Sequence, residues 1–242
     1  MREIFQRIED NTTINIEVDM NAYGYSQKYT WLFSVFIKFD VEEGDTLDYE
    51  EFLETKESLI IALEYEKKAK FVGLRIVDGW SEFYFYAESS KNLNNIVSKM
   101  LTPSHYIYES NVVKDTKWDF HHKFLSPTDL ELAHIQSEKI LFLLEEEGDD
   151  LTLARPVEHY ISFTTPTQKN RFLNTLDLDG FVFKDEIESD AFEYGIALLK
   201  EHNLVRENIQ KIIEVLFEVI QKEDGFYEGW STTLASEIAT NE

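Results

Sequence analysis

The sequence predicts an α+β protein built as two domains of similar size. The chain has 242 residues, more than one small domain needs. Hydrophobic residues make up 43% of it, with 18 Phe, 12 Tyr and 4 Trp, so there is enough apolar material for packed cores. Segments with the periodicity of strands and of helices alternate along the chain, and Ser126-Pro127-Thr128 interrupts them near the middle.

The first half predicts a sheet with two helices. Ile14, Ile16 and Val18 alternate with polar residues, which is typical of a half-buried strand. Asp78-Gly79 favours a tight hairpin turn, because both residues tolerate positive φ. The expected elements are, in order, strands at 14–18 and 31–39, a helix at 48–66, strands at 71–77 and 81–86, a helix at 93–100, and strands at 106–113 and 118–124.

A linker helix is expected between the domains, at 127–150. Thr128 and Glu131 have the spacing of a capping box, and Gly148 is placed to end the helix. The predicted layout is therefore an N-terminal domain at 1–126, the linker helix, and a C-terminal domain at 151–242.

The second half predicts the order β-α-β-β-α-β. Thr165-Pro166-Thr167-Gln168 is a helix start, with Thr as cap and Pro at the first helical position. The expected elements are a strand at 157–163, a helix from 165 to 180, strands at 181–184 and 194–200 around an acidic loop, a helix at 205–223 and a strand at 226–234. This is the ferredoxin-like arrangement, in which two helices pack on one face of a four-stranded antiparallel sheet. The first half repeats the core order with an extra strand at each end, so the predicted fold class is two ferredoxin-like domains.

The formal net charge is −24, from 47 acidic and 23 basic side chains. Such a chain repels polyphosphate at long range, so no direct nucleic-acid binding is expected. A basic protein surface is the natural electrostatic partner. The alternative is that the acidity only keeps the protein soluble.

The sequence lacks residues or segments that several classes of function require. There is no Cys, which removes disulfides, thiolate nucleophiles and Cys-based metal sites. Residues 1–10 lack the apolar core of a signal peptide, and no apolar run has the length of a membrane span, so we expect a cytoplasmic protein with no membrane contact. No phosphate-binding loop or nucleophile elbow occurs, so no catalytic residue, metal or cofactor is assigned and an enzyme is not expected.

The last strand and the acidic loop supply the candidate partner-binding residues. Strand alternation places Phe226, Glu228 and Trp230 on one face, where an exposed Trp230 beside Glu228 would be an interface anchor. The alternative is that Trp230 packs in the core. Four carboxylates of the predicted loop are suited to an Arg-rich segment, with a solvated loop or a bound cation as alternatives. They are Asp185, Glu186, Glu188 and Asp190.

Three histidines do not indicate a metal site. His121 and His122 would point to opposite faces of a strand, so they could not bind one ion together. His159 is interpreted as a hydrogen-bonded, partly buried histidine.

Residues 141–234 resemble the bacterial family called regulator of ribonuclease E activity B (RraB-like). The strings that carry the resemblance are Gly148-Asp149-Asp150-Leu151, Arg155-Pro156-Val157-Glu158-His159-Tyr160 and Tyr227-x-Gly229-Trp230-x-Thr232. The first 125 residues resemble an uncharacterised bacterial domain through Asp115-x-x-Trp118-x-Phe120 and Leu125-x-Pro127. The resemblance implies a non-enzymatic binding protein that modulates RNA turnover by docking on a ribonuclease E-type endonuclease. The alternative is an acidic, immunity-type protein that neutralises a basic partner unrelated to RNA decay.

Overall fold

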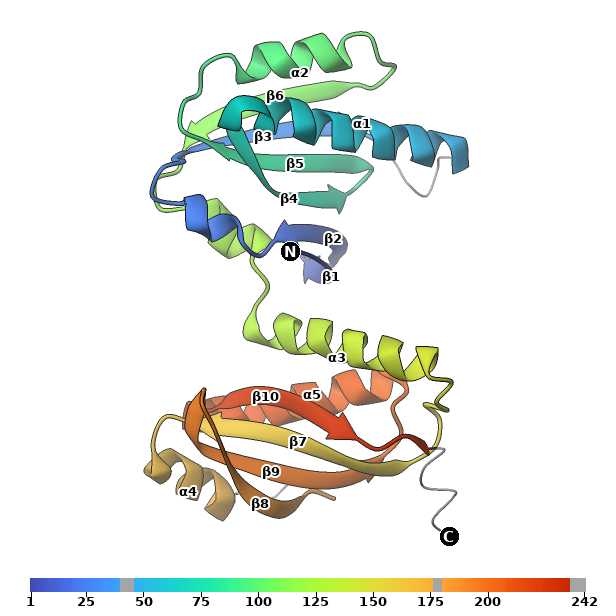
Figure 1. Ribbon diagram of the computed structural model, residues 1–242, viewed down its shortest axis with the longest axis vertical. Coiled ribbons are helices and arrows are strands. Elements are labelled where there is room, and N and C mark those ends of the chain that lie inside the picture. Colours follow the sequence, from blue (N-terminus) through green and yellow to red (C-terminus); the bar gives the residue numbers. More distant parts are fainter. Residues whose placement is uncertain (40–45, 176–179, 236–242) are drawn as a thin grey trace. The chain divides into compact units, whose positions relative to one another are not determined.

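The computed structural model describes residues 1–39, 46–175 and 180–235 (Figure 1). The chain divides into two compact units, Met1–Ser126 and Pro127–Glu242, named unit 1 and unit 2. Each unit combines an antiparallel sheet with helices, so the predicted α+β fold class is confirmed.

Unit 1 contains a six-stranded sheet in the order β1-β2-β4-β5-β3-β6. Helices α1 and α2 pack on one face of it, over a core that includes Phe33, Phe71 and Phe85. Asp78 and Gly79 have φ of 50° and 74°, as the predicted tight turn requires. The elements are β1 (Arg2–Glu9), β2 (Thr12–Asp19), β3 (Trp31–Lys38), α1 (Thr46–Glu64), β4 (Ala69–Val77), β5 (Trp80–Ala87), α2 (Leu93–Leu101) and β6 (Tyr108–Lys114).

The two ends of unit 1 differ from the prediction. The chain begins with an additional edge strand, β1, which was not predicted because its apolar side chains lie on both faces of the sheet. Phe5 is 8% exposed, but its neighbour Ile4 is 73% exposed. The strand predicted at 118–124 is wrong, because His121–Leu125 forms a π-helical turn. The Asp115 carboxylate accepts the backbone N–H groups of Asp119 and Phe120, which precede this turn. Asp115, part of the string Asp115-x-x-Trp118, thus has a structural role. The prediction that His121 and His122 point to opposite faces of a strand fails with it.

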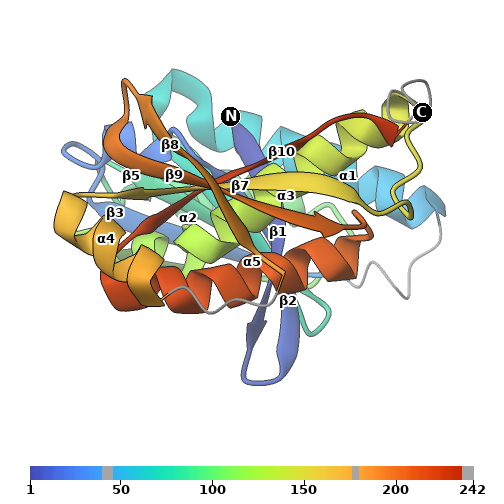
Figure 2. The same ribbon diagram turned by 90° about the horizontal axis from the view of Figure 1, so that it is seen from below.

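Unit 2 contains a four-stranded antiparallel sheet in the order β10-β7-β9-β8. Helices α4 and α5 lie on the same side of this sheet (Figure 2), and α3 packs against α5 and β10. The core beneath α4 and α5 includes Ile161, Phe172 and Leu216. The elements are α3 (Asp129–Glu146), β7 (Arg155–Phe163), α4 (Pro166–Thr175), β8 (Val182–Ser189), β9 (Phe192–His202), α5 (Arg206–Ile220) and β10 (Phe226–Thr232).

The helix expected as a linker packs within unit 2. Its predicted capping box is present: Thr128 Oγ1 accepts the Glu131 N–H at 3.2 Å, and Glu131 Oε2 accepts the Thr128 N–H at 2.7 Å. Ala133 and Leu141 are buried against Val157 of β7, so α3 shares the core of this unit. None of the described helices is long and apolar enough to cross a membrane.

Candidate docking surface

The two faces of the sheet in unit 2 have different surroundings. Ile161 of β7 and its opposite residue on β9, Ile196, point toward the helices and are fully buried. The alternate residues of β7 and β9 lie on the other face, where Ser162 is opposite Gly195 and Glu158 is opposite Leu199. No helix in the described part of unit 2 shares a core with this second face. It is named the open face.

A β-bulge in β10 decides which side chains reach the open face. Tyr227 is opposite Ile161, but the pairing then shifts, so that Trp230 is opposite His159. Both therefore point toward the helices, whereas Glu228 points to the open face and receives a hydrogen bond from Ser162. The expectation that Glu228 and Trp230 share a face is wrong.

Trp230 is consequently a core residue and not an interface anchor. It is 4% exposed, and its indole Nε1–H donates to Ser137 Oγ of α3 at 3.0 Å. This hydrogen bond satisfies the polar end of the ring, as buried tryptophans require. The bulge could not be predicted from the sequence, because it depends on the pairing of β10 with β7.

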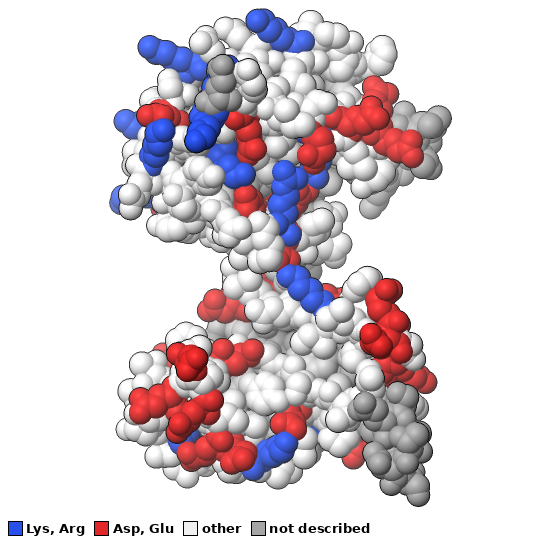
Figure 3. Space-filling model, in the orientation of Figure 1, with Lys and Arg blue, Asp and Glu red and all other residues white. Residues whose placement is uncertain are grey.

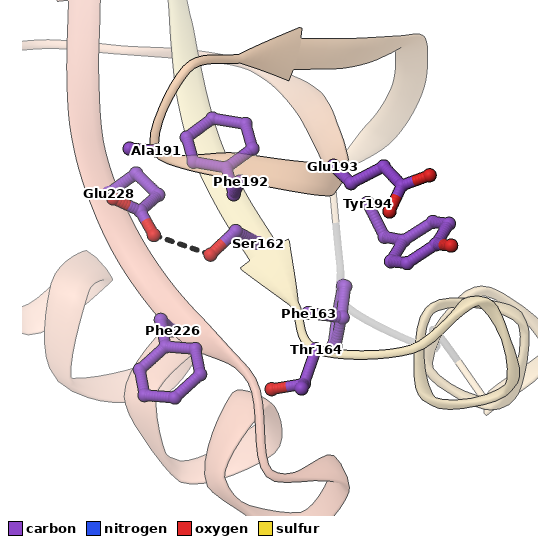
Figure 4. A pocket seen from close by; sticks show the side chains of 9 residues that line it. All are labelled: Ser162, Phe163, Thr164, Ala191, Phe192, Glu193, Tyr194, Phe226 and Glu228. Atoms are coloured by element: carbon purple, nitrogen blue, oxygen red, sulfur yellow. Dashed lines mark hydrogen bonds between the residues drawn. The ribbon is translucent and has the colours of Figure 1, made fainter.

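The open face contains a pocket at the turn between β8 and β9 (Figure 4). It encloses about 380 Å³, near the lower end for small-ligand sites and enough for one side chain. The exposed residue Glu228 lines it and accepts a hydrogen bond from Ser162, with the rings of Phe192 and Phe226 nearby. Phe226 is 53% exposed, which is unusual for so large an apolar side chain. Of these residues only Glu228 was singled out from the sequence.

The four carboxylates predicted to lie in a loop are instead on or next to the edge strand β8. Asp185, Glu186 and Glu188 lie in β8, which pairs with β9, and Asp190 follows it. All four are exposed, so their polarity hid the strand from a prediction based on apolar alternation. Asp185 is opposite Ala197 and Glu186 is opposite Ile196, so these two carboxylates point to opposite faces.

Charge is unevenly divided between the two units. Unit 2 has 9 Lys and Arg against 25 Asp and Glu, a formal charge of −16, while unit 1 has 14 against 22, or −8. On the face shown in Figure 3, carboxylate side chains of unit 2 clearly outnumber its basic ones. Two of the few lysines are engaged: Lys169 pairs with Glu186 at 2.8 Å, and Lys184 pairs with Glu158.

Beneath the sheet lies a buried hydrogen-bond chain of two histidines. His202 Nδ1–H donates to the carbonyl of Asn203 at 2.7 Å, so its Nε2 accepts from His159 Nε2–H at 3.1 Å. His159 Nδ1 then accepts from the Tyr227 hydroxyl at 2.9 Å. Both ring nitrogens of His159 are thus hydrogen-bonded, as predicted, but the residue is fully buried and not partly buried.

Burial keeps these histidines neutral. It lowers the pKa of His159 to about 3, helped by the nearby His202 and Lys200. The pKa of His202 is also lowered by burial. Burial raises the pKa of the Tyr227 phenol, so this group remains protonated. A chain of neutral groups, enclosed in the core, has the properties of a structural network.

A buried ion pair lies at the end of the sheet where β7 begins. Arg155 and Asp149 have fully buried side chains, and Arg155 Nη1 lies 2.6 Å from Asp149 Oδ2. Arg155 also donates to the carbonyls of Asp150, Leu153 and Thr233, which joins the loop after α3 to the end of β10. Three residues of the strings that carry the family resemblance, Asp149, Asp150 and Arg155, therefore have a structural role in unit 2.

The structure gathers the predicted site residues only in part. Glu228 lies in the pocket, and Asp190 adjoins Ala191, which lines the pocket. Trp230, Asp185, Glu186 and Glu188 do not line the pocket. Within the described residues, no group of three or more His, Cys, Asp or Glu is placed to hold a metal ion. The arrangement is suited to binding cationic groups through charge and aromatic contact.

These features define a two-unit α+β protein whose second unit presents an open, acidic sheet face. The chain belongs to a family of unknown function (DUF695), whose family model matches residues 3–126, slightly more than half of the chain. The model of a second family, regulator of ribonuclease activity B, matches residues 134–232. Both resemblances drawn from the sequence are confirmed, and neither match indicates a catalytic family. No curated protein and no solved structure matches the chain.

Proposed function

We propose that this protein is a non-enzymatic regulator that modulates a ribonuclease by docking unit 2 on it. The single observation that carries the proposal is the match of residues 134–232 to regulator of ribonuclease activity B, because that family is one of regulators. The matched range contains most of α3 and the whole sheet of unit 2. Docking and regulation are therefore attributed to one compact unit, and no part in them is assigned to the N-terminal domain, residues 1–126.

Electrostatics supports a basic docking partner, such as the basic region of a ribonuclease E-type enzyme. The charge of −16 on unit 2 attracts a positively charged surface and accelerates encounter, while it repels RNA itself. The proposed contact residues are the exposed carboxylates of the β8–β9 side and the last strand. They are Asp185, Glu188, Asp190 and Glu228, together with Glu186, which lies on the helix side of β8 and pairs with Lys169.

The arrangement of titratable groups supports a binding role over catalysis. General acid–base chemistry needs a group that reaches substrate with a pKa near the working pH. His159 and His202 are enclosed in the core, and their pKa values are lowered by burial, so they do not meet this requirement. We also propose a cytoplasmic location, with which a sequence that has no Cys, and hence no disulfide to form, is compatible.

The test is affinity capture with the full chain from lysate of the native host, at salt from ~0.1 M to ~1 M. We expect recovery of a ribonuclease at low salt and its loss at high salt, followed by direct binding of the two purified proteins. Recovery of basic proteins that take no part in RNA turnover would instead favour the immunity-type alternative. If the purified ribonuclease does not bind the chain at low salt, the proposal is wrong.

A further inference from the structure

The pocket on the open face combines the carboxylate of Glu228 with two aromatic rings, the exposed ring of Phe226 and the half-buried ring of Phe192. The Glu228 carboxylate is oriented because Ser162 Oγ–H donates to its Oε1, which leaves Oε2 for another donor. Ser162 is 3% exposed, so this hydrogen bond is held by a rigid, buried part of β7. In the described part of the chain, no Lys or Arg forms an ion pair with Glu228. The carboxylate is thus oriented and ready to accept.

The rings beside this carboxylate are suited to a flat cation. Phe192 lies on one side of the Ser162–Glu228 pair, and Phe226 lies on the other (Figure 4). Gly195 leaves room for Phe192, whose Cε2 lies 2.5 Å from where a Cβ would stand. Aromatic faces attract cations through the ring quadrupole, and a guanidinium also stacks on them because it is planar. An ammonium group lacks that planar contact.

The neighbouring charges admit a cation and not an anion. Glu193 lines the pocket, and its carboxylate raises the pKa of the neighbouring Tyr194 phenol. Asp190 stands next to the lining residue Ala191. Lys184, the basic residue of β8, is held by Glu158 and does not fill the pocket.

We propose that this pocket is a guanidinium-binding site that receives an arginine side chain from the docked partner. The arginine would stack against Phe226 and Phe192 while its N–H groups donate to Glu228. The chemistry of the site rests on its own geometry, whereas the identification of the arginine with a ribonuclease residue rests on the proposed function. The pocket thereby gives a specific contact to a surface that otherwise attracts through charge alone.

The test uses the full chain and a single-residue probe, N-acetyl-arginine amide, in a chemical-shift titration by NMR. We expect saturable shifts at the backbone amides of 162–164, 192–194 and 226–228. N-acetyl-citrulline amide has the same shape without the charge and should bind ~10-fold more weakly. N-acetyl-lysine amide should bind ~3-fold more weakly, because it keeps the charge but loses the planar contact.

Variants locate the effect in the pocket. Glu228→Gln should weaken the arginine probe ~10-fold and Phe226→Ala ~3-fold. The matched controls are Glu201→Gln, an exposed carboxylate of β9, and Phe142→Ala, which removes a phenyl ring of α3 that is 57% exposed; both should bind the probe as the unchanged chain does. Each variant is checked for an unchanged amide spectrum away from the pocket.

The outcomes separate this inference from the proposed function. Shifts that do not saturate, equal binding of the citrulline probe, or unchanged binding by Glu228→Gln would overturn the pocket while leaving ribonuclease docking intact. Saturable, Glu228-dependent binding without any ribonuclease partner would support the pocket and refute its assignment to ribonuclease docking.

Discussion

Lowering the pH from about 7.5 to about 5 should destabilise unit 2 through His159, by about 2 kcal/mol. Its pKa is lowered to about 3 in the folded protein, against about 6.5 for an unperturbed histidine. A lowered pKa means that the neutral histidine stabilises the fold above pH ~6.5 and that this contribution is lost as the pH falls toward about 3. Each unit of pH below ~6.5 costs about 1.4 kcal/mol, which gives about 2 kcal/mol at pH ~5.

Fluorine NMR of 5-fluorotryptophan protein during urea unfolding measures this effect for unit 2 alone. Trp230 is the one tryptophan of unit 2, and the other three belong to unit 1. The protonation of surface carboxylates also changes stability with pH, so the comparison is with His159→Gln. The free energy of unfolding reported by Trp230 should fall between the two pH values by about 2 kcal/mol more in the unchanged protein than in the variant.

A direct titration provides the second measurement in case His159→Gln does not fold. The carbon-bound protons of the His159 ring should keep one chemical shift from pH ~7.5 to ~5. A midpoint near the ordinary histidine value, or an equal pH dependence in protein and variant, would refute the argument that burial keeps this histidine neutral.

Three substitutions test the packing of unit 2, with the free energy of unfolding read from the Trp230 fluorine signal. Arg155→Met should cost about 3–5 kcal/mol, because it leaves the buried Asp149 carboxylate without its partner. The control is Arg171→Met, which removes an ion pair whose arginine is 56% exposed and should cost about 1 kcal/mol or less. Ser137→Ala should cost about 1–2 kcal/mol through the lost acceptor of Trp230, and an unchanged stability would contradict that hydrogen bond. Gly195→Ala should cost about 1–3 kcal/mol, since the added Cβ would stand 2.8 Å from a carbonyl oxygen of β8; wild-type stability would show that β8 moves away freely.

Local sequence signals predicted the parts of the fold that local interactions determine. The capping box of Thr128 and Glu131 and the helix start at Thr165 and Gln168 both form as expected, because each needs only residues three positions apart. The Asp78-Gly79 turn is of the same kind. The order of helices and strands in unit 2 was predicted as well, but the strand expected at 181–184 was too short, because the exposed, acidic second half of β8 has no apolar alternation.

The candidate site depends on pairing between strands, which the sequence does not display. The bulge after Tyr227 places Glu228 and Trp230 on opposite faces of the sheet, and it is defined by the pairing of β10 with β7. Phe226 and Phe192 are 34 residues apart, and both line the pocket because β10 and the β8–β9 turn lie at the same end of the sheet. Phe226 offered one available signal, since it begins a strand and lies on the same side as Glu228.

Cleavage of a labelled RNA by the purified partner ribonuclease is the most direct measurement of whether unit 2 regulates through its open face. The unchanged chain should alter the cleavage rate, Glu228→Gln should alter it much less, and Glu218→Gln, on the exposed side of α5, should act as the unchanged chain does. No effect of the unchanged chain at concentrations that saturate binding would contradict regulation by docking. Equal effects of all three proteins would contradict the open face as the surface that does it.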